Sequence, residues 1–226
     1  MRDKNRFVVA VDGPAGSGKS SVCRKVALKM GAKYIDSGAI YRTITWYFID
    51  RYGDDFLTVD FLTQLHNINI EQIFDKNGDV KTFLNDIDVS KVIREERIAE
   101  KISLFSDNKE IRDYVTSMLR KWAWENFIIM DGRDIGSVVF PDADLKVYLD
   151  ASVDVRAERR VKEYTELGKN VDENSIKNQI IKRDFKDENR EFGPLKRCRD
   201  SVFLDTSNMT FKDVIEKMAE LIKSSK

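Results

Sequence analysis

One short segment near the N-terminus constrains the fold of this chain more than any other. An apolar run ends at Asp12, and the pattern Gly13-x-x-x-x-Gly18-Lys19-Ser20 follows before a helical pattern begins. Glycines let successive backbone N–H groups surround an anion without interference from Cβ atoms, and a helix directs its positive N-terminal end toward the same place. The order of strand, loop and helix therefore predicts a polyphosphate-binding loop in an α/β fold.

The predicted loop supplies both a cation and a metal ligand. Lys19 is placed to reach the β- and γ-phosphates of a nucleoside triphosphate, and the Ser20 hydroxyl is placed to hold the Mg²⁺ ion that bridges them. The residues expected to contact the triphosphate are Gly13, Pro14, Ala15, Gly16, Ser17, Gly18, Lys19, Ser20 and Ser21.

The hydrophobic pattern of the chain predicts a doubly wound α/β protein. Short apolar runs, each followed by a helical pattern or a polar turn, are typical of the strands of a parallel sheet that helices cover on both faces. The expected strands are 7–11, 33–35, 127–130, 145–149 and 201–204. We expect Ser37 and Ser152 to cap the helices that follow them, and Ser106 or Asp107 to cap the helix that contains Ile111.

The stretch from about Tyr52 to Arg94 interrupts this rhythm. Ile68–Ile70 and Val80–Ile87 have the pattern of strands, and Asn77-Gly78 is a hairpin turn signal. We interpret the stretch as an insertion into the α/β fold.

Composition excludes several classes of function. Lys plus Arg and Asp plus Glu both number 39, so no global field favours nucleic acid or an anionic membrane. Cys23 and Cys198 are widely spaced, which favours free thiols over a disulfide or a metal site. The chain contains no apolar run of signal-peptide or membrane-spanning type. We expect a cytoplasmic monomer that binds small molecules rather than nucleic acid or membranes.

Four separate blocks of the sequence resemble the bacterial cytidylate kinases, a family of P-loop nucleoside monophosphate kinases. The blocks are Asp12–Ser21, Asp36–Arg42, Asp131–Ala143 and Arg183–Ser207, and the resemblance covers nearly the full chain. It implies a five-stranded parallel sheet flanked by helices, with an enlarged monophosphate-binding insertion and a short helical lid. The implied core comprises 1–36, 106–155 and 191–226, the monophosphate-binding domain 37–105, and the lid 156–190.

The resemblance also implies a reaction. It is the Mg²⁺-assisted, in-line transfer of a phosphoryl group from ATP to CMP or dCMP, which gives CDP or dCDP. Two alternatives stay open: another P-loop small-molecule kinase, of the UMP or shikimate type, and a nucleotide-dependent switch. The chain has no Asn-Lys-x-Asp motif for guanine, which disfavours a switch, and its insertion disfavours a shikimate-type enzyme.

An acceptor site is predicted from spacing and from the resemblance together. Arg183, Asp187 and Arg190 occupy positions i, i+4 and i+7, so they are expected to lie along one helix face. Such a stripe is also typical of a solvated, self-paired helix, and only the resemblance favours substrate binding. The other substrate-binding residues that the resemblance implies are Ser37, Arg42 and Arg133 near the phosphate and sugar, and Ser103, Arg112 and Asp134 near the base.

Further residues are candidates for catalysis and metal binding. Arg156 and Arg160 are spaced to close over the transferred phosphoryl group, and they join Lys19 and Arg133 as the expected catalytic set. Asp36 ends the second strand and is expected to hold Mg²⁺ through water, with a helix cap as its alternative role.

Overall fold

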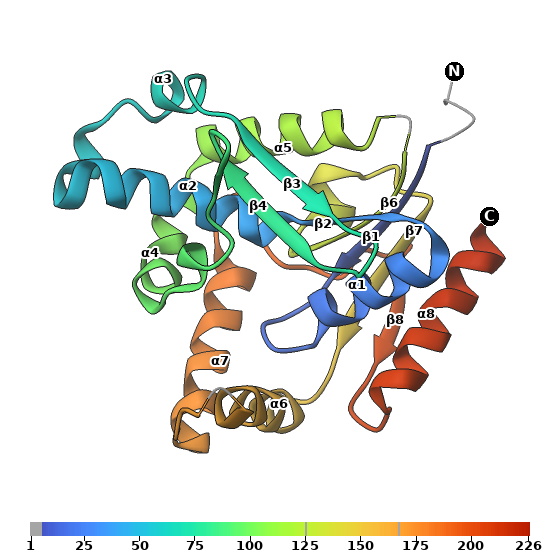
Figure 1. The fold of residues 1–226 in the computed structure, drawn as a ribbon. Coiled ribbons are helices and arrows are strands. Elements are labelled where there is room, and N and C mark those ends of the chain that lie inside the picture. The colour runs from blue at the N-terminus through green and yellow to red at the C-terminus, as the bar shows by residue number, and fades with distance from the viewer. Residues whose placement is uncertain (1–5, 125, 167) are drawn as a thin grey trace.

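The computed structural model describes residues 6–124, 126–166 and 168–226, and within them a five-stranded parallel sheet has the order β2-β6-β1-β7-β8 (Figure 1). The strands are β1 (Phe7–Asp12), β2 (Lys33–Asp36), β6 (Phe127–Gly132), β7 (Leu145–Asp150) and β8 (Val202–Asp205). The predicted parallel sheet is thus confirmed, and each strand begins or ends within two residues of its predicted bounds. Residues 1–5, which the sequence assigns to the core domain, lie outside the described residues.

Each strand of this sheet carries an aspartate at its carboxyl end. These residues are Asp12, Asp36, Asp131, Asp150 and Asp205. The strand register pairs Asp36 with Asp131 and Asp150 with Asp205, so the side chains gather along one edge. In open α/β sheets this is the edge at which ligands bind.

Two apolar layers cover the sheet. On one face Val9 and Val11 pack in a core cluster with residues of α1 (Lys19–Met30) and α8 (Phe211–Ser225). On the other face Val8 and Ala10 share a cluster with side chains of α2 (Ser37–Tyr52), α4 (Glu96–Ser106) and α5 (Lys109–Trp122). Because both faces of β1 are buried, its sequence is an uninterrupted apolar run.

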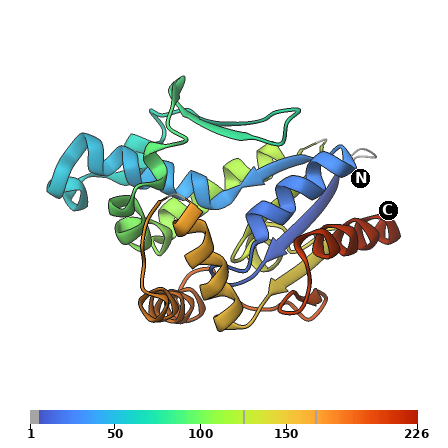
Figure 2. The ribbon, with the colours of Figure 1, turned by 60° about the horizontal axis from the view of Figure 1, so that its bottom comes forward.

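The insertion forms a small antiparallel sheet of β3 (Ile70–Phe74), β4 (Val80–Leu84) and β5 (Ile87–Asp88). The predicted turn at Asn77-Gly78 is confirmed, with Gly78 at φ 85°. The prediction of one strand over 80–87 is wrong, because Asn85 and Asp86 adopt positive φ and reverse the chain. The first strand also starts at Ile70 rather than at Ile68. Figure 2 shows the hairpin on the opposite side of the molecule from α6 and α7.

Short helical segments flank this sheet. They are η1 (Gly53–Thr58), α3 (Phe61–Leu65) and η2 (Val92–Arg94), and a short π-helical turn, η3 (Ile135–Val139), follows β6.

The helix caps differ in part from those predicted. Asp36 rather than Ser37 caps α2, because its Oδ1 accepts a 2.8 Å hydrogen bond from the Ala39 N–H. Asn108, rather than Ser106 or Asp107, caps α5. Ser152 is confirmed as a cap of α6, because its Oγ accepts a 3.3 Å hydrogen bond from the Val155 N–H. Since Asp, Asn and Ser cap helices about equally well, sequence alone leaves such neighbours unresolved.

Two helices form a separate pair at one end of the molecule (Figures 1 and 2). They are α6 (Val153–Glu166) and α7 (Glu173–Asn189), and Ala157, Ile176 and Ile180 form their own small apolar cluster. The pair occupies the predicted lid segment, whose role as a domain stays a prediction. Among the described residues, no helix is long and apolar enough to cross a bilayer.

Candidate active site

The predicted phosphate loop joins β1 to α1 with the geometry that its glycines permit. A Cβ on Gly13 would lie 2.0 Å from the Leu149 carbonyl oxygen, so the backbones of β1 and β7 approach too closely for any side chain. Gly18 precedes α1 in a left-handed conformation, and no side chain of the described residues caps that helix. The N-terminal N–H groups of α1 are therefore available to an anion.

Lys19 curls back over the loop. Its Nζ donates hydrogen bonds to the Pro14 carbonyl at 2.7 Å and to Ser17 Oγ at 3.2 Å. Burial and the charge of Arg133 lower the pKa of Lys19 to about 7. A polyphosphate would supply the negative charge that restores a fully protonated lysine.

The Ser20 hydroxyl contacts a carboxylate that the sequence-based site did not include. Ser20 Oγ donates to Asp131 Oδ2 at 2.8 Å, and the Tyr34 hydroxyl donates to the other oxygen at 2.5 Å. Burial and the neighbouring Asp36 raise the pKa of Asp131. A hydroxyl and a carboxylate are oxygen ligands suited to Mg²⁺. The sequence signal for Asp131 was its position at the carboxyl end of strand β6. The sheet order places β6 beside β1, the strand that precedes the phosphate loop.

Asp36, the other predicted metal ligand, has several protein partners. One carboxylate oxygen caps α2, and the second lies 3.4 Å from Arg42 Nη2 and 3.7 Å from a nitrogen of Arg94. The alternative prediction, that Asp36 caps a helix, is thus confirmed. Its contact with Mg²⁺ stays a prediction.

Several arginines gather near Lys19 of the phosphate loop. Arg133 Nε donates to Asp187 Oδ2 at 2.7 Å. Arg183 keeps contact with solvent. The surrounding protein still desolvates its guanidinium, and this desolvation together with the charge of Arg133 lowers the pKa of Arg183 to about 10. The buried Nε of Arg42 finds no hydrogen-bond acceptor among the described residues. Anionic oxygen atoms would relieve the mutual repulsion of these cations and satisfy the free donor.

Ser37 lies at the same place. It is buried at the start of α2, and its hydroxyl donates to the Asp131 carbonyl oxygen at 2.7 Å. Ser37, one of the predicted phosphate and sugar contacts, therefore lies next to Asp131.

A buried ion pair lies on the other side of these arginines. Arg112 donates to Asp134, and both side chains are at most 6% exposed. Arg190 Nη2 lies 3.6 Å from the second oxygen of Asp134. Arg112 also donates to the Ser106 carbonyl at 2.8 Å, whereas Ser103 lies one turn earlier on α4. A cation and a carboxylate in a dry environment can read the hydrogen-bonding edge of a planar base.

The expected stripe along one helix face is wrong in one respect. The helix α7 ends at Asn189, and Arg190 has the extended backbone of a residue beyond its C-terminus. Arg190 still approaches Asp187, with 3.8 Å between Nη1 and Oδ1. The chain reversal, and not helical spacing, brings Arg190 to Asp134.

Comparison with known proteins shows to which family the chain belongs. The family model described as "Cytidylate kinase" matches residues 9–224. The chain belongs to the cytidylate kinase family. A cytidylate kinase of Lactobacillus gasseri is 41% identical over 218 residues, which are 95% of this chain and 93% of the relative. A cytidylate kinase of Fusobacterium nucleatum is 40% identical over 224 residues, which are 98% of this chain and 100% of the relative.

Solved structures support the fold alone. An uncharacterized protein from Eubacterium ventriosum superposes with a TM-score of 0.55 at 14% identity, covering 97% of this chain and 99% of that one. A protein from Thermus thermophilus gives a TM-score of 0.52 at 12% identity, with 98% of each chain covered.

Family membership decides among the alternatives left open by the sequence. The chain is a nucleotide-binding kinase of the P-loop class and uses ATP, as the cytidylate kinase family does. The match to this family disfavours the two alternatives of a shikimate-type kinase and a nucleotide-dependent switch.

The two predicted lid arginines have different environments in this member of the cytidylate kinase family. Arg156 is 5% exposed, and its guanidinium is bonded to Asp184 and Ala15. Arg160 lies nearer the surface, where it donates to Glu163 at 2.7 Å and stacks over the Tyr164 ring. Both arginines lie on the continuous helix α6 at the expected i, i+4 spacing, but Arg156 pairs with Asp184 of α7 and Arg160 pairs with Glu163 of α6 itself.

Arg159 is a residue that sequence reasoning missed. Its Nη2 donates to the Thr206 carbonyl at 2.8 Å, and its Nη1 lies 3.3 Å from the Ser17 carbonyl oxygen. It thereby connects α6 with the phosphate loop and with the turn after β8. No local pattern distinguishes it from the other arginines of that helix.

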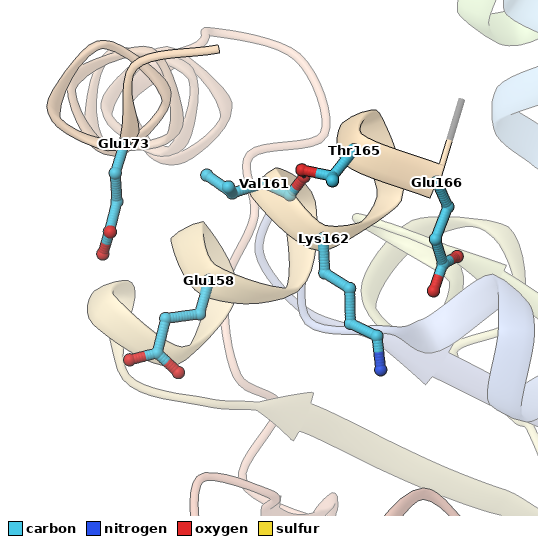
Figure 3. Close-up of a pocket in the computed structure, with 6 residues that line it drawn as sticks. All are labelled: Glu158, Val161, Lys162, Thr165, Glu166 and Glu173. Carbon is cyan, nitrogen blue, oxygen red and sulfur yellow. The ribbon is translucent and has the colours of Figure 1, made fainter. Parts of the chain in front are cut away.

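A surface hollow of about 490 Å³ is lined by residues of α6 and by the first residue of α7 (Figure 3). It is lined by Glu158, Val161, Lys162, Thr165, Glu166 and Glu173. Its carboxylates would repel a polyphosphate, so the hollow is distinct from the nucleotide site.

Proposed function

We propose that this chain transfers the γ-phosphoryl group of ATP to CMP and dCMP, with Mg²⁺, and releases ADP with CDP or dCDP. The observation that carries this proposal is the cluster of cations between the phosphate loop and the buried Arg112–Asp134 pair. A donor loop on one side, a base-reading pair on the other and arginines between them form a site for two nucleotides.

The proposed chemistry relies on alignment and charge neutralisation. The attacking phosphate of the acceptor is already anionic, so the reaction needs no general base. We assign Lys19, Arg133 and Arg183 to the charge that develops on the transferred group. Arg42 and Ser37 are assigned to the acceptor phosphate, and Asp187 and Arg190 to the sugar and phosphate of the acceptor. Arg160, whose guanidinium is nearer the surface than that of Arg156, is assigned to closure over the reacting group.

Ser20 and Asp131 are the proposed residues at the Mg²⁺ site. Bound there, the ion would neutralise charge on the β- and γ-phosphates. The 2.8 Å contact between the two side chains supports this assignment, because it places a hydroxyl and a carboxylate side by side next to Lys19. Asp36 remains a second candidate that would act through water.

Asp134 is the proposed determinant of base choice. The exocyclic amine of cytosine donates hydrogen bonds, which a carboxylate accepts, whereas uracil presents a carbonyl oxygen at the same position. A buried carboxylate facing that carbonyl would lose its partner, and sites of this kind discriminate by about 10⁴-fold. We therefore expect UMP to be a poor acceptor.

A substrate panel tests the proposed function. ADP formation is measured with ATP, Mg²⁺ and, in turn, CMP, dCMP, UMP, AMP, GMP or shikimate. CMP and dCMP should give the highest kcat/KM. Absence of turnover with every pyrimidine monophosphate would contradict the proposal, and Lys19→Ala serves as the inactive control.

We also propose that the protein acts as a cytoplasmic monomer that binds nucleotides and no nucleic acid or membrane. The equal numbers of basic and acidic residues support the part of this proposal that concerns nucleic acid and membranes, because they leave no net charge to attract a polyanion. Light scattering should give the mass of a single chain.

A further inference from the structure

The carboxylate of Asp184 joins α7 to the tip of the phosphate loop. Its Oδ1 accepts a 2.9 Å hydrogen bond from the Ala15 backbone N–H, and its Oδ2 accepts a 2.5 Å bond from Nη1 of Arg156. The same Nη1 donates to the Ala15 carbonyl at 2.8 Å. An ion pair supplied by two helices thus engages both backbone groups of one loop residue. We call Ala15, Arg156 and Asp184 the Ala15 clamp.

The clamp is buried and closely packed. Asp184 is 8% exposed and Arg156 is 5% exposed, and Arg156 Nε is held by the Ala151 carbonyl at 2.9 Å. A Cβ on Gly16 would lie 3.3 Å from Arg156 Cβ and 3.6 Å from Ile180 Cδ1. Charge-assisted hydrogen bonds in such surroundings are strong and demand accurate geometry, so the clamp fixes the relative positions of its parts.

The same helix carries side chains of the acceptor site. Arg183 is the sequence neighbour of Asp184, and its charge acts on Lys19. Asp187, one turn further along α7, accepts the 2.7 Å hydrogen bond from Arg133. Since α7 is continuous from Glu173 to Asn189, the clamp determines where these groups stand relative to the phosphate loop.

We propose that Asp184 is a positioning residue for phosphoryl transfer, acting through the Ala15 clamp to hold Arg183 and Asp187 in register with Lys19. The inference rests on the proposed function and extends it. Asp184 acts through the loop rather than on a nucleotide, because Ala15 and Arg156 already occupy its carboxylate. Loss of the clamp should therefore lower kcat more than it raises KM for either nucleotide, since Lys19 and Arg183 must converge on the same group in the transition state.

Amide hydrogen exchange at Ala15 tests the clamp without substrate. In the nucleotide-free wild-type protein the Ala15 N–H should be protected. In Asp184→Ala its exchange should accelerate by about 100-fold, and Asp184→Asn should lie between the two because it keeps a carbonyl acceptor. Equal exchange rates at Ala15 in the wild type and in Asp184→Ala would overturn the inference.

Kinetics test the positioning role. Asp184→Asn and Arg156→Met should each lower kcat by about 10- to 100-fold, with KM for ATP and CMP changed by less than about threefold. The double variant should lose little more than either single variant, because both break one unit. Arg156→Lys, which keeps the charge beside Asp184, provides a milder break of the clamp if Asp184→Asn does not fold.

Ile176→Ala is the matched control. Ile176 belongs to the same α6–α7 cluster as Ile180 but lies two turns from Asp184. The control should keep kcat within about twofold of wild type despite a lower melting temperature. Unchanged kcat in Asp184→Asn, or an equal loss in Ile176→Ala, would overturn the positioning role. A wild-type protein unable to phosphorylate CMP would instead contradict the proposed function, and the Ala15 exchange result would still stand.

Discussion

The hydroxyl of Ser20 donates a 2.8 Å hydrogen bond to Oδ2 of Asp131, and this contact connects the phosphate loop with the end of the neighbouring strand β6. Asp131→Asn keeps the shape of the side chain and an oxygen for the Tyr34 hydroxyl, but it removes the negative charge. We expect kcat to fall by roughly 10²-fold, as on loss of one group that stabilises charge in a transition state. The melting temperature should change little, because a neutral amide is easier to bury than a carboxylate.

The measurement for Asp131→Asn is kcat as a function of Mg²⁺ concentration. The matched control is Asp205→Asn, which changes an exposed aspartate at the end of another strand of the same sheet. A wild-type dependence on Mg²⁺ in Asp131→Asn would remove Asp131 from the metal site.

Base selection provides a second prediction. Asp134→Asn retains one carbonyl oxygen and gains an amide that can donate to the carbonyl of uracil. The ratio of kcat/KM for CMP to that for UMP should therefore fall by about 100-fold or more, while KM for ATP changes by less than about twofold. Steady-state kinetics with both acceptors measure the ratio. An unchanged ratio would assign base choice to other residues than Asp134.

Lys19 leads to a prediction about protons. Burial and Arg133 lower its pKa to about 7 in the nucleotide-free protein, so at pH 8 most molecules carry a neutral lysine. Polyphosphate favours the charged form of Lys19 and raises its pKa. Binding of ATP at pH 8 should therefore be accompanied by the uptake of about one proton by the protein. Calorimetric titration in two buffers of different ionisation enthalpy gives the number.

Lys19→Met is the control for this measurement, because it removes the titrating group. It should abolish the proton uptake even where residual ATP binding persists. Proton release on binding to the wild type, or uptake that survives in Lys19→Met, would show that another group titrates.

The part of the site that binds the phosphoryl donor could be predicted from local sequence. The phosphate loop depends on glycines and a lysine that are neighbours in the chain, and the structure has the expected strand, loop and helix there. The Ser20–Asp131 contact depends instead on which strand lies beside β1, and the strand order is a tertiary property. Sequence spacing could not provide it.

Packing decided the remaining differences. Arg156 and Arg160 have the same helical spacing, yet only Arg156 meets α7 and forms a buried ion pair. Arg190 reaches Asp134 because the chain turns at the end of α7, where a purely helical interpretation continues the helix. Cap positions differed because neighbouring Asp, Asn and Ser residues have similar cap preferences. The Arg112–Asp134 pair joins two distant segments, and only the family resemblance indicated it.

Asp12 gives a prediction about stability and pH. Its carboxylate accepts hydrogen bonds from the Ile135 N–H at 2.8 Å and the Gly136 N–H at 2.7 Å, which hold the turn after Asp134. Burial raises the pKa of Asp12 from 3.8 to about 6, despite these hydrogen bonds. The folded protein therefore binds this proton more tightly than the unfolded chain does. The contribution of Asp12 to the free energy of unfolding is fully present below about pH 4 and is lost as the pH rises through about 6.

Asp12→Asn, which cannot titrate, isolates this contribution. The difference in the free energy of unfolding between wild type and Asp12→Asn should decrease by roughly 3 kcal/mol between pH 3 and pH 8, at 1.36 kcal/mol per pKa unit. Urea unfolding of both proteins at several pH values measures the difference. Asp205→Asn is the control of opposite sign, because hydrogen bonds from Ser207 lower the pKa of Asp205 and its contribution is lost as the pH falls. A difference for Asp12 that stays constant with pH, or that increases with it, would contradict a raised pKa in the folded protein.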